Sequence, residues 1–159
     1  MYKKVLVPLD GSELDECALN HIRSLVKEDG IRDVTLLKVI RVDINWSRGE
    51  YGLKVDLDKI RKSAFAAARE YLDGVASQLG SEGIKVKTEI QEGNRPADTI
   101  IEYARRHGMD MIAIASHGYT GVKKLIYGSV ADKVLHASPV PVLLMGPEVC
   151  RPAEFSKAA

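Results

Sequence analysis

Residues 111–129 read M-I-A-I-A-S-H-G-Y-T-G-V-K-K-L-I-Y-G-S, and this stretch sets the fold class that the rest of the chain supports. Its first five residues form an apolar run typical of a buried strand. Gly128 and Ser129 stand at the start of an amphipathic segment, residues 130–137, which predicts a helix. A glycine-bearing turn between a strand and a helix start offers an anion backbone N–H groups and the positive end of a helix dipole. The stretch therefore predicts the phosphate-binding turn of a nucleotide site.

The rest of the chain alternates apolar runs with amphipathic segments. Predicted strands cover residues 5–8, 34–40, 84–90, 111–115 and 140–145, and predicted helices cover residues 13–29, 57–79, 96–107 and 130–137. Such alternation implies a parallel sheet with helices on both faces. Residues 84–90 alternate apolar with charged side chains, which places that strand near a sheet edge. We therefore predict an α/β fold, an open five-stranded parallel sheet in the order 3-2-1-4-5.

A doubly wound sheet of this order has one crevice, at the carboxyl ends of the strands where the winding direction reverses. That point lies between the first and the fourth strand. The segments that end these two strands are Asp10-Gly11-Ser12 and residues 115–118. Two site-like segments that are far apart in the sequence are thus predicted to meet in space.

Composition and charge are those of an ordinary globular protein. The 159 residues suffice for one domain with a single core. A net charge of +1 gives no electrostatic reason to expect binding to nucleic acid or to an acidic membrane surface. Cys17 and Cys150 stand at unrelated positions and suggest no disulfide framework. Because no signal-peptide pattern and no run of membrane-spanning length occurs, we expect a cytoplasmic protein without a membrane segment.

Other chemistries lack their sequence motifs. The chain contains no G-x-x-x-x-G-K-[ST] phosphate loop, no G-x-G-x-x-G after a strand and no G-x-S-x-G nucleophile elbow. It also contains no H-x-x-x-H or C-x-x-C pair that would suggest a bound metal. We therefore predict neither catalytic residues nor a metal held by the protein itself.

Three motifs resemble those of the universal stress protein family. They are V-L-V-P-L-D-G-S at residues 5–12, S-H-G-Y-T-G at residues 116–121, and G-S-V-A-D-K-V at residues 128–134 followed by P-V-P-V at residues 139–142. The likeness is collinear from about residue 3 to residue 145 and includes the helix start at Gly93, Pro96 and Ala97. It implies a Rossmann-like fold of the adenine nucleotide alpha hydrolase type, in agreement with the residue pattern.

One branch of this family binds ATP or AMP through Gly, two residues, Gly, nine residues, Gly, then Ser or Thr. Gly118, Gly128 and Ser129 match the later positions, whereas the first position holds Ala115. Alanine would lower the affinity if the site needed a positive φ or a very close phosphate contact there. The resemblance implies bound ATP or AMP, with Mg²⁺ held through the phosphates, since no carboxylate cluster could cage the ion alone.

Carried over by position, the resemblance implies ten ligand-binding residues in three groups. They are Pro8, Leu9, Asp10 and Val39 around the adenine and ribose, Ile114, Ala115 and Gly118 as the floor, and Gly128, Ser129 and Val130 around the phosphates. Asp10 could accept a hydrogen bond from a ribose hydroxyl or from the adenine amine, and Ser129 could donate from its hydroxyl as well as its N–H.

Each of these motifs also has a purely structural interpretation. Asp10-Gly11-Ser12 fits a turn with a helix cap, Gly118 fits a chain reversal, and Gly128-Ser129 fits an N-cap. Three functions are therefore open: a nucleotide-binding stress-response module, a nucleotide-free dimer that acts through protein contacts, and a slow ATPase. We expect the first, which would signal through its bound state to an unknown protein client. No motif distinguishes ATP from AMP.

The last predicted strand indicates a homodimer. Residues 140–145 read V-P-V-L-L-M and lie at an edge of the predicted sheet. Proteins cover or pair an apolar edge, because it is otherwise an aggregation hazard. Since relatives commonly pair through this strand, we predict a homodimer through Val140–Met145, the alternative being a monomer whose tail, residues 147–155, covers the edge.

The predicted domain organisation is simple. Residues 1–147 form one domain, and residues 148–159, which show weak patterning, form a loose tail. Residues 41–55 have no periodicity and are predicted to be a loop.

Overall fold

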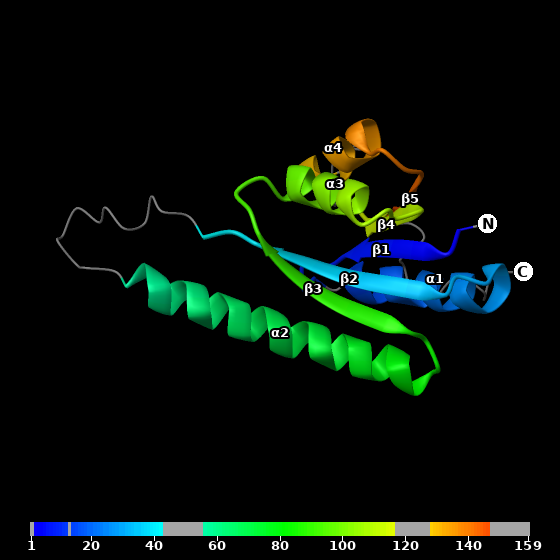
Figure 1. The fold of residues 1–159 in the computed structure, drawn as a ribbon, viewed down its shortest axis with the longest axis horizontal. Coiled ribbons are helices and arrows are strands. Elements are labelled where there is room, and N and C mark those ends of the chain that lie inside the picture. The colour runs from blue at the N-terminus through cyan, green and yellow to red at the C-terminus, as the bar shows by residue number, and fades with distance from the viewer. Residues whose placement is uncertain (1, 13, 43–55, 117–127, 147–159) are drawn as a thin grey trace, which may run out of the picture.

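The computed structural model describes residues 2–12, 14–42, 56–116 and 128–146 (Figure 1). The predicted loop at residues 43–55, the turn at residues 117–127 and the tail after residue 146 lie outside the described residues. The elements in chain order are β1 (Lys4–Pro8), α1 (Leu14–Asp29), β2 (Asp33–Ile40), α2 (Leu57–Ser81), β3 (Val86–Glu92), α3 (Pro96–Arg106), β4 (Met111–Ala115), α4 (Ser129–Ala137) and β5 (Val142–Met145).

The five strands form one parallel sheet in the order β3-β2-β1-β4-β5. The predicted fold class and strand order are therefore confirmed. β1 lies at the centre, where Val5 pairs with Val34 of β2 on one side and with Met111 of β4 on the other. Because the chain winds outwards from β1 in both directions, the reversal point lies at the carboxyl ends of β1 and β4.

Helices cover both faces of the sheet, with α1 and α2 on one face and α3 and α4 on the other (Figure 1). Each face has its own hydrophobic core, because successive strand side chains point to opposite sides. In β1, Val5 and Val7 pack with the α1 and α2 side, whereas Leu6 packs with the α3 and α4 side, and all three are fully buried. The continuous apolar run in β1 follows from this burial on both faces.

The longest described helix, α2, has 25 residues and begins at a capped end. The Asp56 carboxylate accepts a hydrogen bond from the Lys59 N–H at 3.1 Å. Of its side chains, those of Ala68, Leu72 and Leu79 are buried against the sheet. None of the described helices is long and apolar enough to cross a membrane.

β3 begins two residues later than the sequence pattern predicts, at Val86. The Ile84 N–H donates to the Leu79 carbonyl at 3.1 Å, so Ile84 closes the end of α2 before the strand begins. Gly83 makes this reversal with φ +82°, a conformation that favours glycine. As predicted, β3 is an edge strand with a wetter face.

β5 also begins later than predicted, at Val142 and not at residue 140. Pro141 has no N–H to donate to a strand ladder. Its carbonyl still accepts from the Ile112 N–H of β4 at 3.0 Å, so Pro141 contacts the neighbouring strand as a hydrogen-bond acceptor only.

Candidate functional site

A cavity of about 510 Å³ opens at the carboxyl edge of the sheet, at the predicted reversal point. It is lined from β1, β2 and β4, from the amino ends of α3 and α4, and from the segment between β1 and α1. The structure brings nine of the ten predicted site residues to it: Pro8, Leu9, Asp10, Val39, Ile114, Ala115, Gly128, Ser129 and Val130. The tenth, Gly118, lies outside the described residues.

A buried carboxylate holds the segment after β1 in place. The Asp15 side chain accepts from the Gly11 N–H at 2.6 Å and from the Asp10 N–H at 3.4 Å. It also accepts from the Tyr71 hydroxyl of α2 at 2.6 Å. Asp15 is only 5% exposed, so these donors replace the water that its carboxylate has lost. The network joins the mouth of the cavity to α2.

Lys38 of β2 supports the same segment from the other side. Its ammonium donates to the Asp10 carbonyl at 2.8 Å and lies 5.0 Å from the centre of the Tyr71 ring. Gly11 turns beneath it with φ +87°, and a Cβ there would meet the Lys38 Nζ at 3.3 Å. Asp10 in turn accepts from the Ser12 N–H at 2.9 Å, which completes a tight turn. The exposed Asp10 carboxylate is therefore presented by an ordered backbone.

The ionisation of Asp15 is set mainly by its burial. Desolvation raises the pKa of the Asp15 carboxyl above its ordinary value of 3.8, and the charge of Asp10 adds to this rise. The hydrogen bonds from Tyr71 and Gly11 oppose it but do not cancel it. The Asp15 carboxyl, at the centre of this network, therefore takes up a proton at a higher pH than an ordinary aspartate does.

The amino end of α4, where the sequence predicts phosphate contacts, lines the cavity. Gly128 is the N-cap, and no side chain from the described residues caps the helix. The first N–H bonded within the helix is that of Asp132, which donates to the Gly128 carbonyl at 2.9 Å. Since the N–H groups of a first turn have no intrahelical acceptor, those of Ser129 and Val130 are available at the cavity wall. This end of the cavity suits a phosphate.

Ala115, the departure from the glycine pattern, ends β4 in regular strand geometry. None of the described residues other than glycine has a positive φ, so Ala115 does not occupy a conformation reserved for glycine. Gly128 likewise has φ −53° and ψ 145°, which any residue can adopt. At both positions the side-chain volume, and not the backbone conformation, is what can affect a ligand.

The opposite wall of the cavity is apolar. Val39 and Ile114 face it, together with Leu37 and Ile100, and all four belong to the core between the sheet and α3 or pack against it. Near the rim, the Ser12 hydroxyl is buried and makes no hydrogen bond within the described part of the chain. A flat apolar surface beside an unsatisfied donor and a helix amino end suits a heterocycle that carries a phosphate.

Sequence reasoning placed Ser12 at the crevice without naming it as a ligand-binding residue, and it missed six other residues that line the cavity. These six are Asp15, Leu37, Arg41, Pro96, Ile100 and Ala131. Arg41 follows β2, so the rule that sites form at carboxyl strand ends could have found it. Asp15 carried no such signal, because the partner that reveals its role, Tyr71, lies 56 residues away in the chain. Within the described residues, no group of three or more His, Cys, Asp or Glu side chains could hold a metal ion.

Fold and crevice together define a doubly wound α/β protein with a cavity at the reversal point of its sheet, between β1 and β4. The chain belongs to the universal stress protein family, which it matches over residues 1–145. It is similar to universal stress protein MJ0577 of Methanocaldococcus jannaschii, with 32% identity over 156 residues that cover 91% of this chain and 95% of the relative. The solved structure of MJ0577 superimposes with a TM-score of 0.75 and covers 92% of this chain and 96% of that chain.

Two more distant structures share the fold. A universal stress protein from Archaeoglobus fulgidus, determined in complex with dAMP, has a TM-score of 0.63 at 19% identity and covers 90% of this chain and 97% of that chain. A family member from Arabidopsis thaliana, determined with AMP bound, has a TM-score of 0.64 at 20% identity and covers 96% of this chain and 94% of that chain.

Proposed function

We propose that this protein binds an adenine nucleotide, ATP or AMP, in the crevice at the carboxyl edge of its sheet and acts as a stress-response binding module. One observation carries the proposal. Nine of the residues that the sequence predicts for the site, from four separate segments of the chain, line a single cavity. The complexes of two family members with AMP and dAMP support the ligand class.

The cavity offers a matching partner to each part of the nucleotide. The adenine would lie against Val39 and Ile114, and the ribose would face Asp10. The phosphates would take the N–H groups of Ser129 and Val130, as anions do at a helix amino end. Mg²⁺ would be held mainly by phosphate oxygens and water, as is usual for this ion. The buried Ser12 hydroxyl, without a partner in the described residues, would gain an acceptor.

Mass spectrometry of small molecules released from freshly purified protein tests this proposal. We expect ATP or AMP, and we expect added ATP or AMP to raise the melting temperature because a ligand stabilises only the state that binds it. GTP at the same concentration serves as the control for base recognition. Recovery of nucleotide-free protein whose melting temperature does not respond to millimolar ATP or AMP would contradict the proposal.

We further propose that two copies of the chain pair through β5. β5 is an edge strand, and its Val142, Leu143 and Leu144 side chains are each partly exposed. A strand with apolar side chains and one unpaired edge is the feature that a two-fold contact covers. The proposal concerns residues 140–145, since the tail lies outside the described residues.

Leu144→Lys should convert this dimer into a monomer. The substitution places a charge at the contact, while its long stem can still cover the apolar surface beneath. Light scattering should give the mass of two chains for the natural protein and of one chain for the variant, with circular dichroism to confirm that the variant is folded. A folded variant that remains dimeric would show that the contact lies on another surface.

A further inference from the structure

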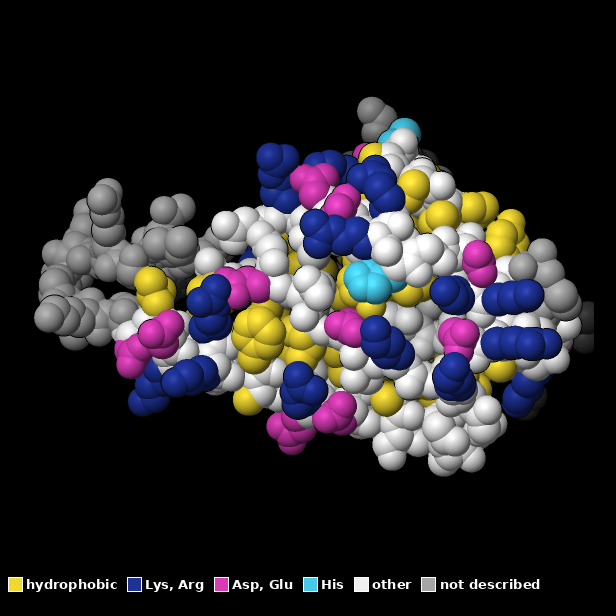
Figure 2. All heavy atoms as spheres, viewed as in Figure 1, with side chains coloured by type: hydrophobic (Ala, Val, Ile, Leu, Met, Phe, Trp, Pro, Cys, Tyr) yellow, Lys and Arg dark blue, Asp and Glu magenta, His cyan; other side chains and the backbone are white. Residues whose placement is uncertain are grey.

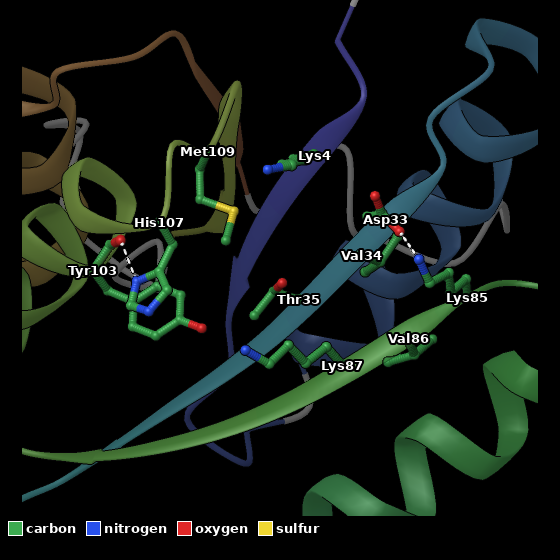
Figure 3. Close-up of a pocket in the computed structure, with 10 residues that line it drawn as sticks. All are labelled: Lys4, Asp33, Val34, Thr35, Lys85, Val86, Lys87, Tyr103, His107 and Met109. Atoms are coloured by element: carbon green, nitrogen blue, oxygen red, sulfur yellow. Dashed lines mark hydrogen bonds and ion pairs between the residues drawn. The ribbon is translucent and has the colours of Figure 1, made fainter.

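A second cavity, of about 340 Å³, lies at the opposite, amino edge of the sheet. It is bounded by the first residues of β1, β2 and β3 and by the carboxyl end of α3 (Figure 3). The cavity exists because α3 ends at Arg106 and does not cover the starts of the outer strands. It shares no lining residue with the crevice at the carboxyl edge.

One wall of this amino-edge cavity is a flat aromatic surface. The rings of Tyr103 and His107, one helical turn apart, stack with centroids 3.9 Å apart and planes at 17°. His107 is fixed by its Nδ1, which lies 3.0 Å from the Tyr103 carbonyl oxygen and donates to it. Met109, which is 8% exposed, continues the wall. An aromatic or aliphatic group could pack against this surface.

Two hydroxyl groups lie in the cavity with little water to satisfy them. Thr35 is 5% exposed and interrupts the apolar run of β2, where its neighbours Val34 and Leu36 are fully or almost fully buried. Tyr103 is 4% exposed, and its hydroxyl is buried without a hydrogen-bond partner among the described residues. Burial raises the pKa of the Tyr103 hydroxyl, so it is a neutral donor near pH 7. The unsatisfied Tyr103 hydroxyl is a donor that destabilises the fold, and a ligand with an acceptor oxygen could satisfy it.

The rim of the cavity is cationic. Among the lining residues, Lys4 comes from β1, Lys87 comes from β3 and Lys85 directly precedes β3, whereas β2 contributes the carboxylate of Asp33. Lys85 pairs with Asp33 at 2.6 Å and Lys87 pairs with Glu89 at 2.7 Å. Figure 3 shows the Lys4 side chain pointing across the opening towards Met109. Lys and Arg side chains also gather over the starts of the strands in the space-filling view (Figure 2).

We infer that the amino-edge cavity binds a small organic anion, a carboxylate with an aromatic or aliphatic body. The body packs against the Tyr103 and His107 rings and Met109, and the carboxylate accepts from the Thr35 hydroxyl and from Lys4. Such a ligand uses the apolar and aromatic wall, the buried hydroxyl of Thr35 and the charge of Lys4. The inference does not depend on nucleotide binding at the other edge.

Nuclear magnetic resonance with benzoate and 3-phenylpropionate as probes tests this inference, with benzamide as the neutral control. The chain has four methionines, so a methyl-labelled sample gives few signals and Met109 can be assigned by substitution. Both acids at millimolar concentration should shift the Met109 methyl signal and the Thr35 and Lys87 amide signals, and benzamide should shift them less. No Met109 shift with either acid, or equal shifts with benzamide, would overturn the inference.

Two variants make the test specific. Lys4→Gln should weaken benzoate binding by about fivefold, the effect of one exposed charge, whereas Lys62→Gln on α2 should leave it unchanged. Thr35→Val should weaken binding while the fold survives, because valine has nearly the same shape and removes only the hydroxyl donor. A Thr35→Val variant that is less stable but binds benzoate normally would show that the hydroxyl is only structural and would contradict the inference.

Discussion

Replacing Gly128 with valine should abolish adenine-nucleotide binding while the fold survives. Gly128 is the N-cap of α4 at the cavity wall, and its φ of −53° and ψ of 145° are accessible to valine. The backbone therefore tolerates the change, but the branched side chain stands where the phosphates would approach. Losing two charge-assisted hydrogen bonds should weaken binding by about 100-fold or more. Isothermal titration calorimetry with ATP and AMP measures the loss.

Two control variants separate this effect from a general loss of stability. Gly80→Val makes the same change at the end of α2, where a Cβ would meet nothing within 4 Å, and should leave nucleotide affinity unchanged. Ala115→Gly restores the glycine of the family pattern and should keep or tighten the affinity. A folded Gly128→Val variant with normal affinity would show that the phosphates bind elsewhere.

Asp15→Ala should lower the free energy of unfolding by about 1–3 kcal/mol, because the Gly11 N–H and the Tyr71 hydroxyl lose their buried acceptor. It should also weaken nucleotide binding, since the backbone that presents Asp10 is no longer held. Tyr71→Phe should lower the free energy of unfolding less, because the Asp15 carboxylate keeps the hydrogen bond from the Gly11 N–H. Chemical denaturation of both single variants and of the double variant measures the coupling free energy between Asp15 and Tyr71. Additive losses would mean that Asp15 and Tyr71 do not act as one network.

The same carboxyl group predicts a pH dependence. Because burial raises the pKa of Asp15, the folded protein keeps this proton to a higher pH than the unfolded chain does. The contribution of this group to the free energy of unfolding is therefore complete below pH 3.8 and is lost as the pH rises through the folded-state pKa. Asp15→Asn cannot ionise, so it should gain stability relative to the natural protein across this window. If the difference in the free energy of unfolding between the two proteins did not change with pH, the raised pKa of Asp15 would be contradicted.

The fold was predictable from the sequence because its signals are local. Helix ends are marked by Gly30, Gly83 and Gly108, each of which has a positive φ in the structure. The alternation in β3 identifies an edge strand. The strand boundaries were less accurate, since Ile84 belongs to the closing turn of α2 and Pro141 cannot donate to the sheet. These are effects of hydrogen bonding that side-chain pattern does not reveal.

The carboxyl-edge crevice was predictable in part because topology brings known strand ends together. Its supporting network was not predictable, because Asp15, Lys38 and Tyr71 come from three elements and none belongs to a motif. The amino-edge cavity carried no sequence signal either. Thr35 looks like an ordinary strand residue until its burial is known.

The most direct test of the central claim is a titration of isotopically labelled protein with AMP, followed through its backbone amide signals. We expect the largest shifts on the residues after β1 and at the start of α4, with Gly11, Ser129 and Val130 among them, and we expect Gly128→Val to remove these shifts. Shifts confined to the amino edge of the sheet, or none at millimolar AMP, would contradict it.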